Sequence, residues 1–438
     1  MLNNRSILQR RFKHSACLLD FTETALAALQ PQALVRQAVK LNGDTLTIQG
    51  RRFTVSRYKH IFVVGAGKAT AAMAEALVDI LGGHITAGAL NVPHPAKRSL
   101  GKIALQPASH PYPDVRTVTG AKAIYAIARQ ATADDLVICL VSGGGSSMLT
   151  LPMPGIRLAD QIKLSRQLMH ASADIVELNT VRKHLSAIKG GRLAEAAAPA
   201  TVVSLIISDV LGDRLDTIAS GPTVPDTTTT ADAMAILDRY NVGSKTLRQV
   251  IIGTETPKTL PRNVHNFLIG NNQLALQTIA RLAKTVGLHP VVLTSSLRGE
   301  AKEVAQVLTA IAGEVEQYQR PVKTPALLLA GGETTVTVLG KGYGGRNQEL
   351  VLAAVPFLSK RMTILSLATD GVDGVTPTPV AGAMADGHVA DHCVVRGINY
   401  HDYLYSNNSF HCLKELGCLL RTGPTGTNVG DIVMLLVQ

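Results

Sequence analysis

Apolar and polar positions follow two different periods along this chain, and each period predicts one kind of secondary structure. Short apolar runs bounded by glycine, proline or asparagine are typical of buried strands, and apolar residues three or four apart are typical of amphipathic helices. The expected strands are residues 60–64, 87–92, 137–141, 201–207, 265–270, 290–294, 326–330, 362–368 and 432–437. The expected helices are two within 16–41, 69–81, 118–131, two within 158–188, 273–286, 301–318 and one after Arg346. This alternation predicts an α/β fold with mainly parallel sheets.

The length of the chain and a change of pattern near its middle predict two domains. A chain of 438 residues is too long for one ordinary hydrophobic core. Residues 253–263 carry Gly253, Pro257 and Pro261, which is typical of a segment that crosses between domains. We therefore expect an N-terminal α/β domain of residues 1–252 and a smaller C-terminal α/β domain of residues 253–438.

The composition favours α/β layers and small anionic partners. Aromatic residues make up 4% of the chain and tryptophan is absent, which argues against an aromatic-rich β-sandwich and against a surface that stacks nucleic-acid bases. The net charge of +11 attracts anions, and small phosphates satisfy it as well as nucleic acid does. No nucleic-acid-binding module is recognisable in the sequence. No apolar run reaches the about 18 residues that a membrane span needs, so we expect no membrane partner.

The cysteines and the N-terminus bear on the cellular setting. Five cysteines without a CxxC pair are typical of a reducing, cytoplasmic protein whose thiols pack in the core. The basic residues Arg5, Arg10, Arg11 and Lys13 are expected to form a solvated N-terminal arm. Residues 1–19 contain no acid, so a transit peptide is the alternative interpretation, although no cleavage signal is evident.

The strand at 137–141 ends in a glycine and serine loop that is suited to anions. Consecutive glycines let the backbone approach a ligand closely, while hydroxyl and N–H groups ahead of the next helix can point at phosphate oxygens. The residues of this expected anion cradle are Ser142, Gly143, Gly144, Gly145, Ser146 and Ser147.

A second glycine turn follows the strand at 60–64. The pair Gly65 and Gly67 suggests a dinucleotide site, but Thr70 replaces the third glycine of that fingerprint. The next strand, 87–92, ends without an acid for a ribose. The remaining candidate of this turn is Lys68, which lies at the N-terminal end of a helix and beside two glycines.

Two groups of charged residues follow the cradle. Asn179 lies three and four positions before Arg182 and Lys183 on an expected helix and shares a face with both, and Lys189 follows at a glycine turn. The carboxyl end of the strand 201–207 carries Asp209 and Asp213. Ligands bind at this edge of α/β sheets, so we consider the two acids candidates for metal binding or proton abstraction.

The second half of the chain repeats these features. Four glycines at 340, 342, 344 and 345 precede Arg346, whose guanidinium suits bidentate recognition of phosphate or carboxylate. The strand 362–368 ends in the pair Asp370 and Asp373. An EF-hand is excluded there because its later ligands are missing.

Taken in order, these motifs resemble the class II glycerate kinases, whose C-terminal part is the MOFRL domain. The resemblance runs from about residue 60 to the C-terminus. It implies a Rossmann-like N-terminal domain, a smaller MOFRL-type domain and a cleft between them. The matching segments are 64–68, 142–147, 179–183, 189–191, 208–209, 220–223, 331–333, 344–347, 369–374 and 426–428.

The resemblance also implies an activity and a set of site residues. The activity is phosphorylation of D-glycerate by ATP with Mg²⁺, and the 2-hydroxyl is the expected acceptor. The implied catalytic residues are Lys68, Asp209 and Arg346. The implied substrate- and nucleotide-binding residues are Gly65, Gly67, Ser142, Gly143, Gly144, Gly145, Ser146, Ser147, Asn179, Arg182, Lys183, Lys189, Glu333 and Asn347. Expected Mg²⁺ ligands are Asp213, Asp370 and Asp373.

Other functions remain as alternatives. The runner-up is an NAD(P)H-dependent hydroxypyruvate reductase, which the incomplete dinucleotide fingerprint disfavours. A serine hydrolase would need GxSxG, whereas residues 144–148 read GGSSM. The sequence leaves open which hydroxyl accepts the phosphoryl group, which nucleotide is preferred, which domain holds ATP, which aspartate binds Mg²⁺ and the oligomeric state, a homodimer included.

Overall fold

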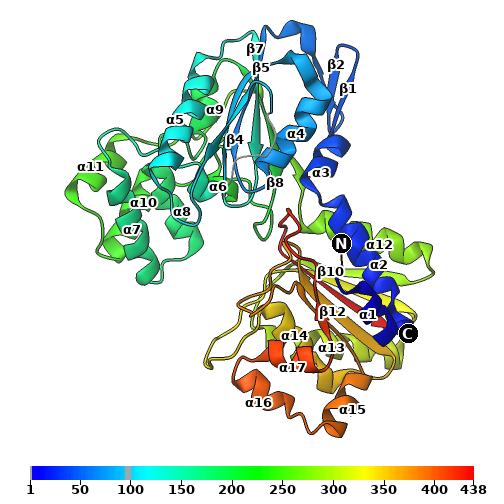
Figure 1. The fold of residues 1–438 in the computed structure, drawn as a ribbon. Coiled ribbons are helices and arrows are strands. Elements are labelled where there is room, and N and C mark those ends of the chain that lie inside the picture. Colours follow the sequence, from blue (N-terminus) through cyan, green and yellow to red (C-terminus); the bar gives the residue numbers. More distant parts are fainter. Residues whose placement is uncertain (1, 94–99) are drawn as a thin grey trace. The chain divides into compact units, whose positions relative to one another are not determined.

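The structure, a computed structural model, describes residues 2–93 and 100–438 of the chain. These residues form two compact units (Figure 1). Pro31–Gly270 forms the unit that we call the parallel-sheet unit. Residues 2–30 and Asn271–Gln438 together form the unit that we call the mixed-sheet unit.

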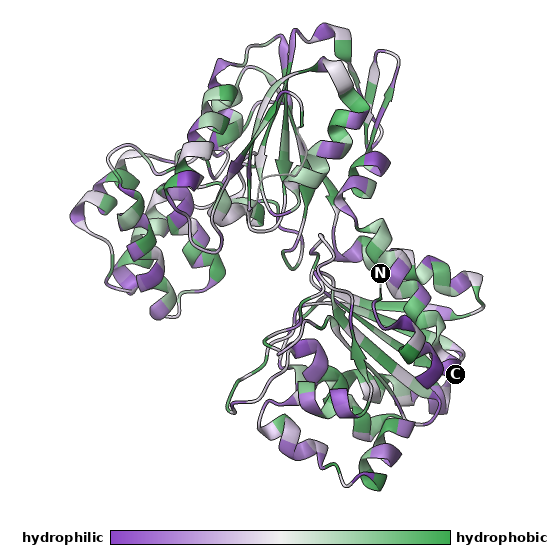
Figure 2. Ribbon diagram, viewed as in Figure 1, coloured by the Kyte–Doolittle hydropathy of each residue, from purple (hydrophilic) through white to green (hydrophobic). Residues whose placement is uncertain are grey.

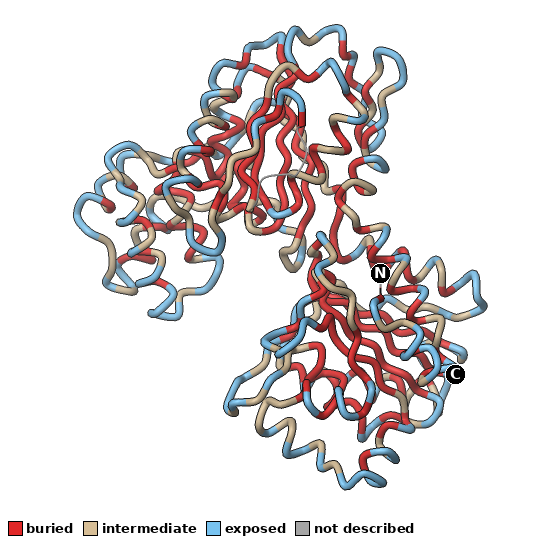
Figure 3. Tube along the Cα trace, viewed as in Figure 1, coloured by how far each residue is buried: buried red, intermediate tan, exposed pale blue. Residues whose placement is uncertain are grey.

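The parallel-sheet unit is built on six strands in the order β6-β5-β4-β7-β8-β9, and all neighbouring strands run parallel. The strands are β4 (His60–Ala66), β5 (Ile85–Val92), β6 (Ile103–Pro107), β7 (Asp135–Val141), β8 (Thr201–Ile207) and β9 (Val264–Gly270). The central strands β4, β7 and β8 are buried along almost their whole length, as Figure 3 shows. Burial on both faces explains why they read as continuous apolar runs in the sequence.

Helices cover both faces of this sheet (Figure 1). On one face lie α3 (Pro31–Ala38) and α4 (Thr70–Leu81), and on the other lie α5 (Val115–Gln130) and α9 (Arg192–Ala197). Small side chains of α5 and α9 pack on the sheet residues that alternate toward them. The predicted Rossmann-like α/β domain with a parallel sheet is therefore confirmed. A small antiparallel sheet precedes it, formed by β1 (Val39–Asn42), β2 (Thr45–Ile48) and β3 (Arg51–Thr54).

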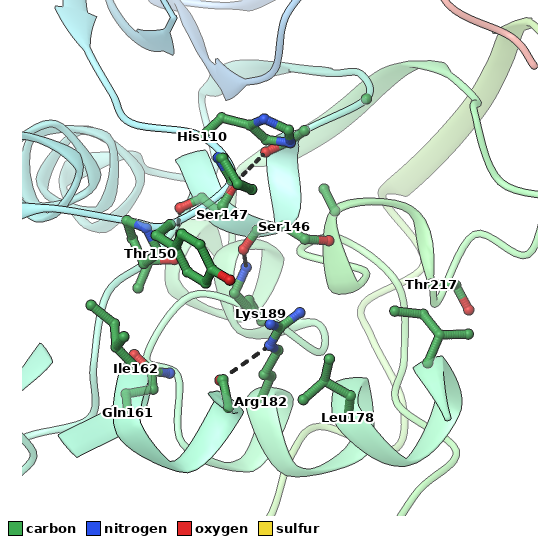
Figure 4. Close-up of a pocket in the computed structure, with 18 of the residues that line it drawn as sticks. His110, Ser146, Ser147, Thr150, Gln161, Ile162, Leu178, Arg182, Lys189 and Thr217 are labelled. Carbon is green, nitrogen blue, oxygen red and sulfur yellow. Dashed lines mark hydrogen bonds between the residues drawn. The ribbon is translucent and has the colours of Figure 1, made fainter. Parts of the chain in front are cut away.

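A group of helices extends from the parallel-sheet unit and has a core of its own. Its members are α7 (Leu158–His170), α8 (Ile175–His184), α10 (Thr230–Arg239) and α11 (Lys245–Gly253). Their apolar faces turn toward one another, and Figure 2 shows polar residues on the outer faces. The short helix α6 (Gly145–Met148) follows β7 directly. This arrangement places α7 and α8 beside the loop that leaves β7 (Figure 4).

The mixed-sheet unit has six strands in the order β10-β11-β15-β12-β13-β14. They are β10 (His289–Leu297), β11 (Ala326–Gly332), β12 (Met362–Ala368), β13 (Gly382–Asp386), β14 (Leu419–Leu420) and β15 (Asp431–Val437). Only β10 and β11 pair in parallel, so the prediction of a mainly parallel second sheet is wrong. The last strand, β15, inserts between β11 and β12 and runs antiparallel to both. Hydrophobic periodicity identifies strands but does not specify their direction.

Helices also lie on both faces of the mixed sheet. The helices of this unit are α1 (Arg5–Arg11), α2 (Cys17–Ala28), α12 (Asn272–Thr285), α13 (Ala301–Tyr318), α14 (Arg346–Ala354), α15 (His388–Val395), α16 (Tyr400–Tyr405) and α17 (Ser409–Glu415). Helix α2 packs against α12, and α13 packs against α14. Short 3₁₀ helices occur in both units at Lys13–Ser15, Val55–Arg57, Gly82–His84, Ile218–Ser220 and Val355–Phe357.

The division into units differs from the expected boundary at residues 252 and 253. Strand β9 completes the parallel sheet by pairing with β8, so residues up to Gly270 belong to that unit. The N-terminal residues belong instead to the mixed-sheet unit, where Ser15 Oγ lies 2.6 Å from Thr363 Oγ1. Arg5, expected in a solvated arm, forms ion pairs with Asp20 and Glu23. Among the residues that the structure describes, no helix is long and apolar enough to span a membrane.

Candidate active site

The candidate active site is a cavity of about 380 Å³ at the carboxyl ends of β7 and β8 in the parallel-sheet unit (Figure 4). The loop after β7 forms one wall, residues that follow β8 form a second, and α7 and α8 form a third. Ligands bind at this edge of parallel sheets because the loops that leave the strands gather there. Its polar lining includes Ser146, Ser147, Arg182, Lys189 and Asp209.

The glycine loop after β7 is fixed to the loop after β4. Ala69 donates its N–H to Ser142 Oγ at 3.0 Å, and Lys68 donates its N–H to the Gly143 carbonyl at 2.9 Å. A Cβ on Gly67 would lie 2.1 Å from Ser142 Oγ, and a Cβ on Gly143 would lie 2.2 Å from Asp209 Oδ2. Glycine is therefore required at both positions for the loops to approach each other and Asp209.

The expected anion cradle uses some of its backbone donors internally. The N–H groups of Ser142, Gly145 and Ser147 donate to carbonyl oxygens of Ala66, Ser142 and Gly144. A ligand in the cavity therefore meets hydroxyl groups and side-chain cations in addition to backbone N–H groups. A run of glycines in the sequence does not indicate which of its N–H groups are used internally.

Among the described residues, Arg182 and Lys189 are the lysine and arginine side chains that line the cavity. Lys189 is 1% exposed, and its Nζ donates to the Ser146 carbonyl oxygen at 2.6 Å. Burial and the nearby charge of Arg182 lower the pKa of Lys189 to about 7. Arg182 is partly buried on α8, and its Nε donates to Ser165 Oγ at 3.4 Å. Burial also lowers the pKa of Arg182. Figure 4 shows both side chains in the cavity wall.

Asn179 and Lys183, expected to bind substrate, do not line this cavity. The Nζ of Lys183 lies 2.5 Å from Asp226 Oδ1, and both side chains are almost fully buried. Burial acts to raise the pKa of Asp226, but hydrogen bonds from Lys183 and Thr228 lower it below its usual value. Asn179 Oδ1 accepts a hydrogen bond from Ser220 Oγ at 3.3 Å. In the structure, these two side chains join α8 to neighbouring segments.

Lys68, Asp209 and Asp213 lie at different positions relative to the cavity. Lys68 is exposed, and its Cγ would lie 3.3 Å from a Cβ on Gly144, so its stem passes the glycine loop. Burial and the charge of Lys68 lower the pKa of His110, which lines the cavity. Asp209 also lines the cavity, whereas Asp213 lies outside the lining, in a turn with a left-handed φ of 54°.

Arg346 begins α14 in the mixed-sheet unit and is held by two carboxylates. Its Nε and Nη2 donate to the two carboxylate oxygens of Asp431 at 2.5 and 2.9 Å, and its Nη1 lies 2.9 Å from Glu333 Oε1. Burial acts to lower the pKa of Arg346, but these acids raise it above its ordinary value. Burial raises the pKa of Asp431 to about 6 against the opposing effect of the guanidinium. Two of the expected site residues, Arg346 and Glu333, are thus in contact.

The other predicted residues of this unit have local partners. Asp373 is 1% exposed, and its oxygens accept hydrogen bonds from the backbone and side-chain amides of Asn347 and Gln348 at 2.8–3.1 Å. This geometry differs from the expected Mg²⁺ ligand, because the carboxylate caps the start of α14. Asp370 Oδ1 accepts from the Val372 N–H at 3.0 Å. Within residues 2–93 and 100–438, no three His, Cys, Asp or Glu side chains are grouped as a metal site.

Sequence reasoning missed several residues of these clusters. Thr150, Gln161 and Ser165 line the cavity from positions that carry no recognisable motif. Asp226 and Asp431, the partners of two predicted cations, were also missed. Asp431 had a detectable signal, because it is an acid at the first position of an otherwise apolar strand. A buried acid at such a position needs a donor or a cation nearby.

The fold and the cavity define a two-unit α/β protein with a cationic pocket at the carboxyl edge of a parallel sheet. Comparison with known proteins identifies the family. Residues 17–252 match the family described as a domain of unknown function (DUF4147), and residues 326–431 match the MOFRL family. The D-glycerate 2-kinase of Thermotoga maritima is 40% identical over 424 residues, which cover 96% of this chain and 97% of that protein.

Two further comparisons are informative. A glycerate kinase crystal structure from Thermotoga maritima matches with a TM-score of 0.88 at 38% identity, covering 96% of this chain and 98% of that one. A protein from Agrobacterium vitis named putative hydroxypyruvate reductase is 42% identical over 391 residues, 86% of each chain. The chain belongs to the glycerate kinase family whose C-terminal part is the MOFRL domain, which confirms the resemblance noted in the sequence.

Proposed function

We propose that this protein transfers a phosphoryl group from ATP to D-glycerate and produces 2-phosphoglycerate. The observation that carries the proposal is the cavity, which combines the cations Arg182 and Lys189 with the acid Asp209. A hydroxy acid offers an anion for the former and a hydroxyl for the latter. The relatives named glycerate kinase and D-glycerate 2-kinase, similar over nearly the whole chain, support the same substrate.

Each residue has a proposed role that follows from the needs of phosphoryl transfer. That reaction depends on positioning and on cations that stabilise the charge developing on the phosphoryl group. Asp209 orients or deprotonates the attacking hydroxyl, and the loop 142–147 positions an anionic group beside it. Lys68 and Arg346 provide positive charge for phosphate or carboxylate oxygens.

Mg²⁺ is the proposed metal, because it bridges phosphates and neutralises their charge in this class of reaction. Mg²⁺ usually binds one or two carboxylates, with substrate phosphates and water completing its shell. Such a site needs no cluster of three acidic side chains. Asp213 and Asp370 are therefore retained as proposed ligands, whereas Asp373 is already surrounded by four amide donors.

The reductase alternative has less support in the site. Thr70 replaces the third glycine of the dinucleotide fingerprint, and its Oγ1 donates to the Gly67 carbonyl at 2.9 Å. Asn91, near the end of β5, is fully buried, and its Nδ2 donates to the carbonyls of Thr117 and Met148. A ribose-binding acid would be expected near this strand end.

The experiment is an assay of the purified protein with ATP, Mg²⁺ and D-glycerate, coupled through enolase so that 2-phosphoglycerate and 3-phosphoglycerate are distinguished. We expect 2-phosphoglycerate, and we expect Asp209→Asn to lower kcat by about 10²-fold or more, as loss of a general base does. Circular dichroism would check that the variant is folded. Absence of turnover with any hydroxy acid would exclude the kinase, and NADPH oxidation with hydroxypyruvate would establish the reductase.

A further inference from the structure

Lys189 is the largest fully buried side chain in the described part of the chain, and it lies in the wall of a cavity. Its ammonium group donates to the Ser146 carbonyl oxygen, which supplies no negative charge. Arg182 lies in the same wall and donates from Nε to a serine hydroxyl. Arg182 and Lys189 therefore line the same cavity.

In the part of the chain that the structure describes, these two charges have no counter-ion. Across residues 2–93 and 100–438, no carboxylate lies within salt-bridge distance of Lys189 or Arg182. Lys183, the residue after Arg182, shows the usual solution, because it is paired with Asp226 at 2.5 Å. Burying a cation without a partner is costly, so such a site is typical of a group that a ligand completes.

The groups around the two cations indicate which anion they receive. Asp209 lines the same cavity, and we have proposed that it acts on the acceptor hydroxyl. A polyphosphate placed here would add several negative charges beside that carboxylate. A 2-hydroxy acid instead presents one carboxylate to the cations and one hydroxyl to the acid.

We infer that Lys189 and Arg182 form the subsite for the carboxylate of the hydroxy acid. Pairing of this carboxylate with the two cations selects D-glycerate over uncharged polyols. The inference rests on the proposed function and adds the orientation of the acceptor within the cavity. The bound carboxylate accepts hydrogen bonds from the Lys189 ammonium and the Arg182 guanidinium, and no covalent bond changes.

Binding at this subsite is linked to a proton. Burial and Arg182 hold the pKa of Lys189 at about 7, and a bound carboxylate favours the charged form and raises it. The other titratable groups in the lining are His110, Tyr112, Arg182 and Asp209. At pH 8, His110 is neutral, because burial and the charge of Lys68 lower its pKa. Proton uptake at pH 8 therefore reports on Lys189.

The first test separates the two substrates by steady-state kinetics. Lys189→Met should raise KM for D-glycerate by about 10- to 100-fold, as expected when a charged hydrogen bond is lost, and should leave KM for ATP within about twofold. The matched control is Lys163→Met, an exposed lysine of α7, which should leave both constants unchanged. A rise in KM for ATP alone, or in neither constant, would overturn the inference. If Lys189→Met does not fold, Arg182→Met tests the same subsite.

The second test does not depend on turnover. Calorimetric titration of the wild type with D-glycerate at pH 8, in buffers of different ionisation enthalpy, should show uptake of more than half a proton per ligand bound. Lys189→Met should bind weakly without this uptake. Binding to the wild type without proton uptake would refute the subsite. Binding with uptake but without kinase turnover would refute the proposed function and leave the subsite standing, so the two failures are distinguishable.

Discussion

The candidate ligand-binding cations of the two units have opposite surroundings. In the mixed-sheet unit, Arg346 is fixed by Asp431 and Glu333, so its position is determined before any ligand arrives. In the parallel-sheet unit, Arg182 and Lys189 face a cavity with a serine hydroxyl and a carbonyl oxygen as their partners. The first arrangement orients a cation, whereas the second leaves electrostatic energy to be gained on binding an anion.

Neighbouring residues of α8 show the same difference within one helix. Successive side chains on a helix point about 100° apart, so Arg182 and Lys183 cannot share one environment. Arg182 faces the cavity, and Lys183 forms its buried ion pair with Asp226. A basic pair in the sequence therefore combines one candidate ligand-binding residue with one structural residue.

The largest expected effect concerns the stability of two buried lysines. Lys183→Met should lower the free energy of unfolding by about 3–5 kcal/mol, because it leaves the Asp226 carboxylate buried without its partner. Lys189→Met should change it by no more than about 1 kcal/mol, because it removes a buried charge that has no carboxylate partner in the described structure. Denaturant unfolding of both variants, followed by circular dichroism, measures the difference.

The same substitution in the same unit makes each variant the control of the other. Equal losses of stability would mean that Lys189 is as well compensated as Lys183 and would remove the contrast. The contribution of the Lys183 pair should also depend on pH. The folded-state pKa of Asp226 lies below its unfolded value, so the stabilisation is present above the ordinary carboxyl range and is lost as the pH falls through the folded pKa.

The second prediction tests the fixed cation. Arg346→Ala should lower kcat/KM by about 10²-fold or more, as expected for a group that stabilises charge in the transition state. It should also lower the free energy of unfolding by about 1–3 kcal/mol, because Asp431 loses both of its strong donors. Enolase-coupled kinetics and denaturant unfolding measure the two effects. The matched control, Arg361→Ala, removes an exposed arginine of the same unit, and near-normal kcat/KM in Arg346→Ala would remove that residue from the mechanism.

The fold could be predicted in its elements but not in all its connections. The strands of the parallel sheet are buried on both faces, so their apolar runs are visible in the sequence. The antiparallel insertion of β15 and the pairing of β9 with β8 depend on contacts between distant residues, which periodicity does not encode. The same is true of α2, whose apolar face indicates that it packs but does not identify its partner, α12.

The glycine positions of the candidate site could be predicted, because two loops approach each other closely there. Gly67 and Gly143 are needed for close approach, and such glycines stand out after an apolar strand. The partners of the predicted cations come from other elements of the same unit: Ser165 on α7 contacts Arg182, and Asp431 at the start of β15 contacts Arg346. Neither carries a motif, because its role arises from a neighbour that is distant in sequence. Lys183 is predicted from the sequence as a binding residue but is buried against Asp226 in the structure. That contact joins residues distant in sequence, so the sequence pattern does not reveal it.

The smallest expected effects compare the partners of the two arginines. Asp431→Asn should lower kcat/KM by about 10-fold, because Arg346 loses a bidentate charged partner at 2.5 and 2.9 Å and keeps only Glu333. A merely structural role would lower stability without this change, and Asp431→Glu should recover part of kcat/KM by restoring the charge.

Ser165→Ala should change KM for D-glycerate by about twofold or less, because a hydrogen bond at 3.4 Å contributes little. Kinetics of the three variants under the same conditions measure the comparison. If Ser165→Ala had the larger effect, Arg182 would be the cation that the protein positions. Arg346 would then no longer be the cation that is fixed before a ligand binds.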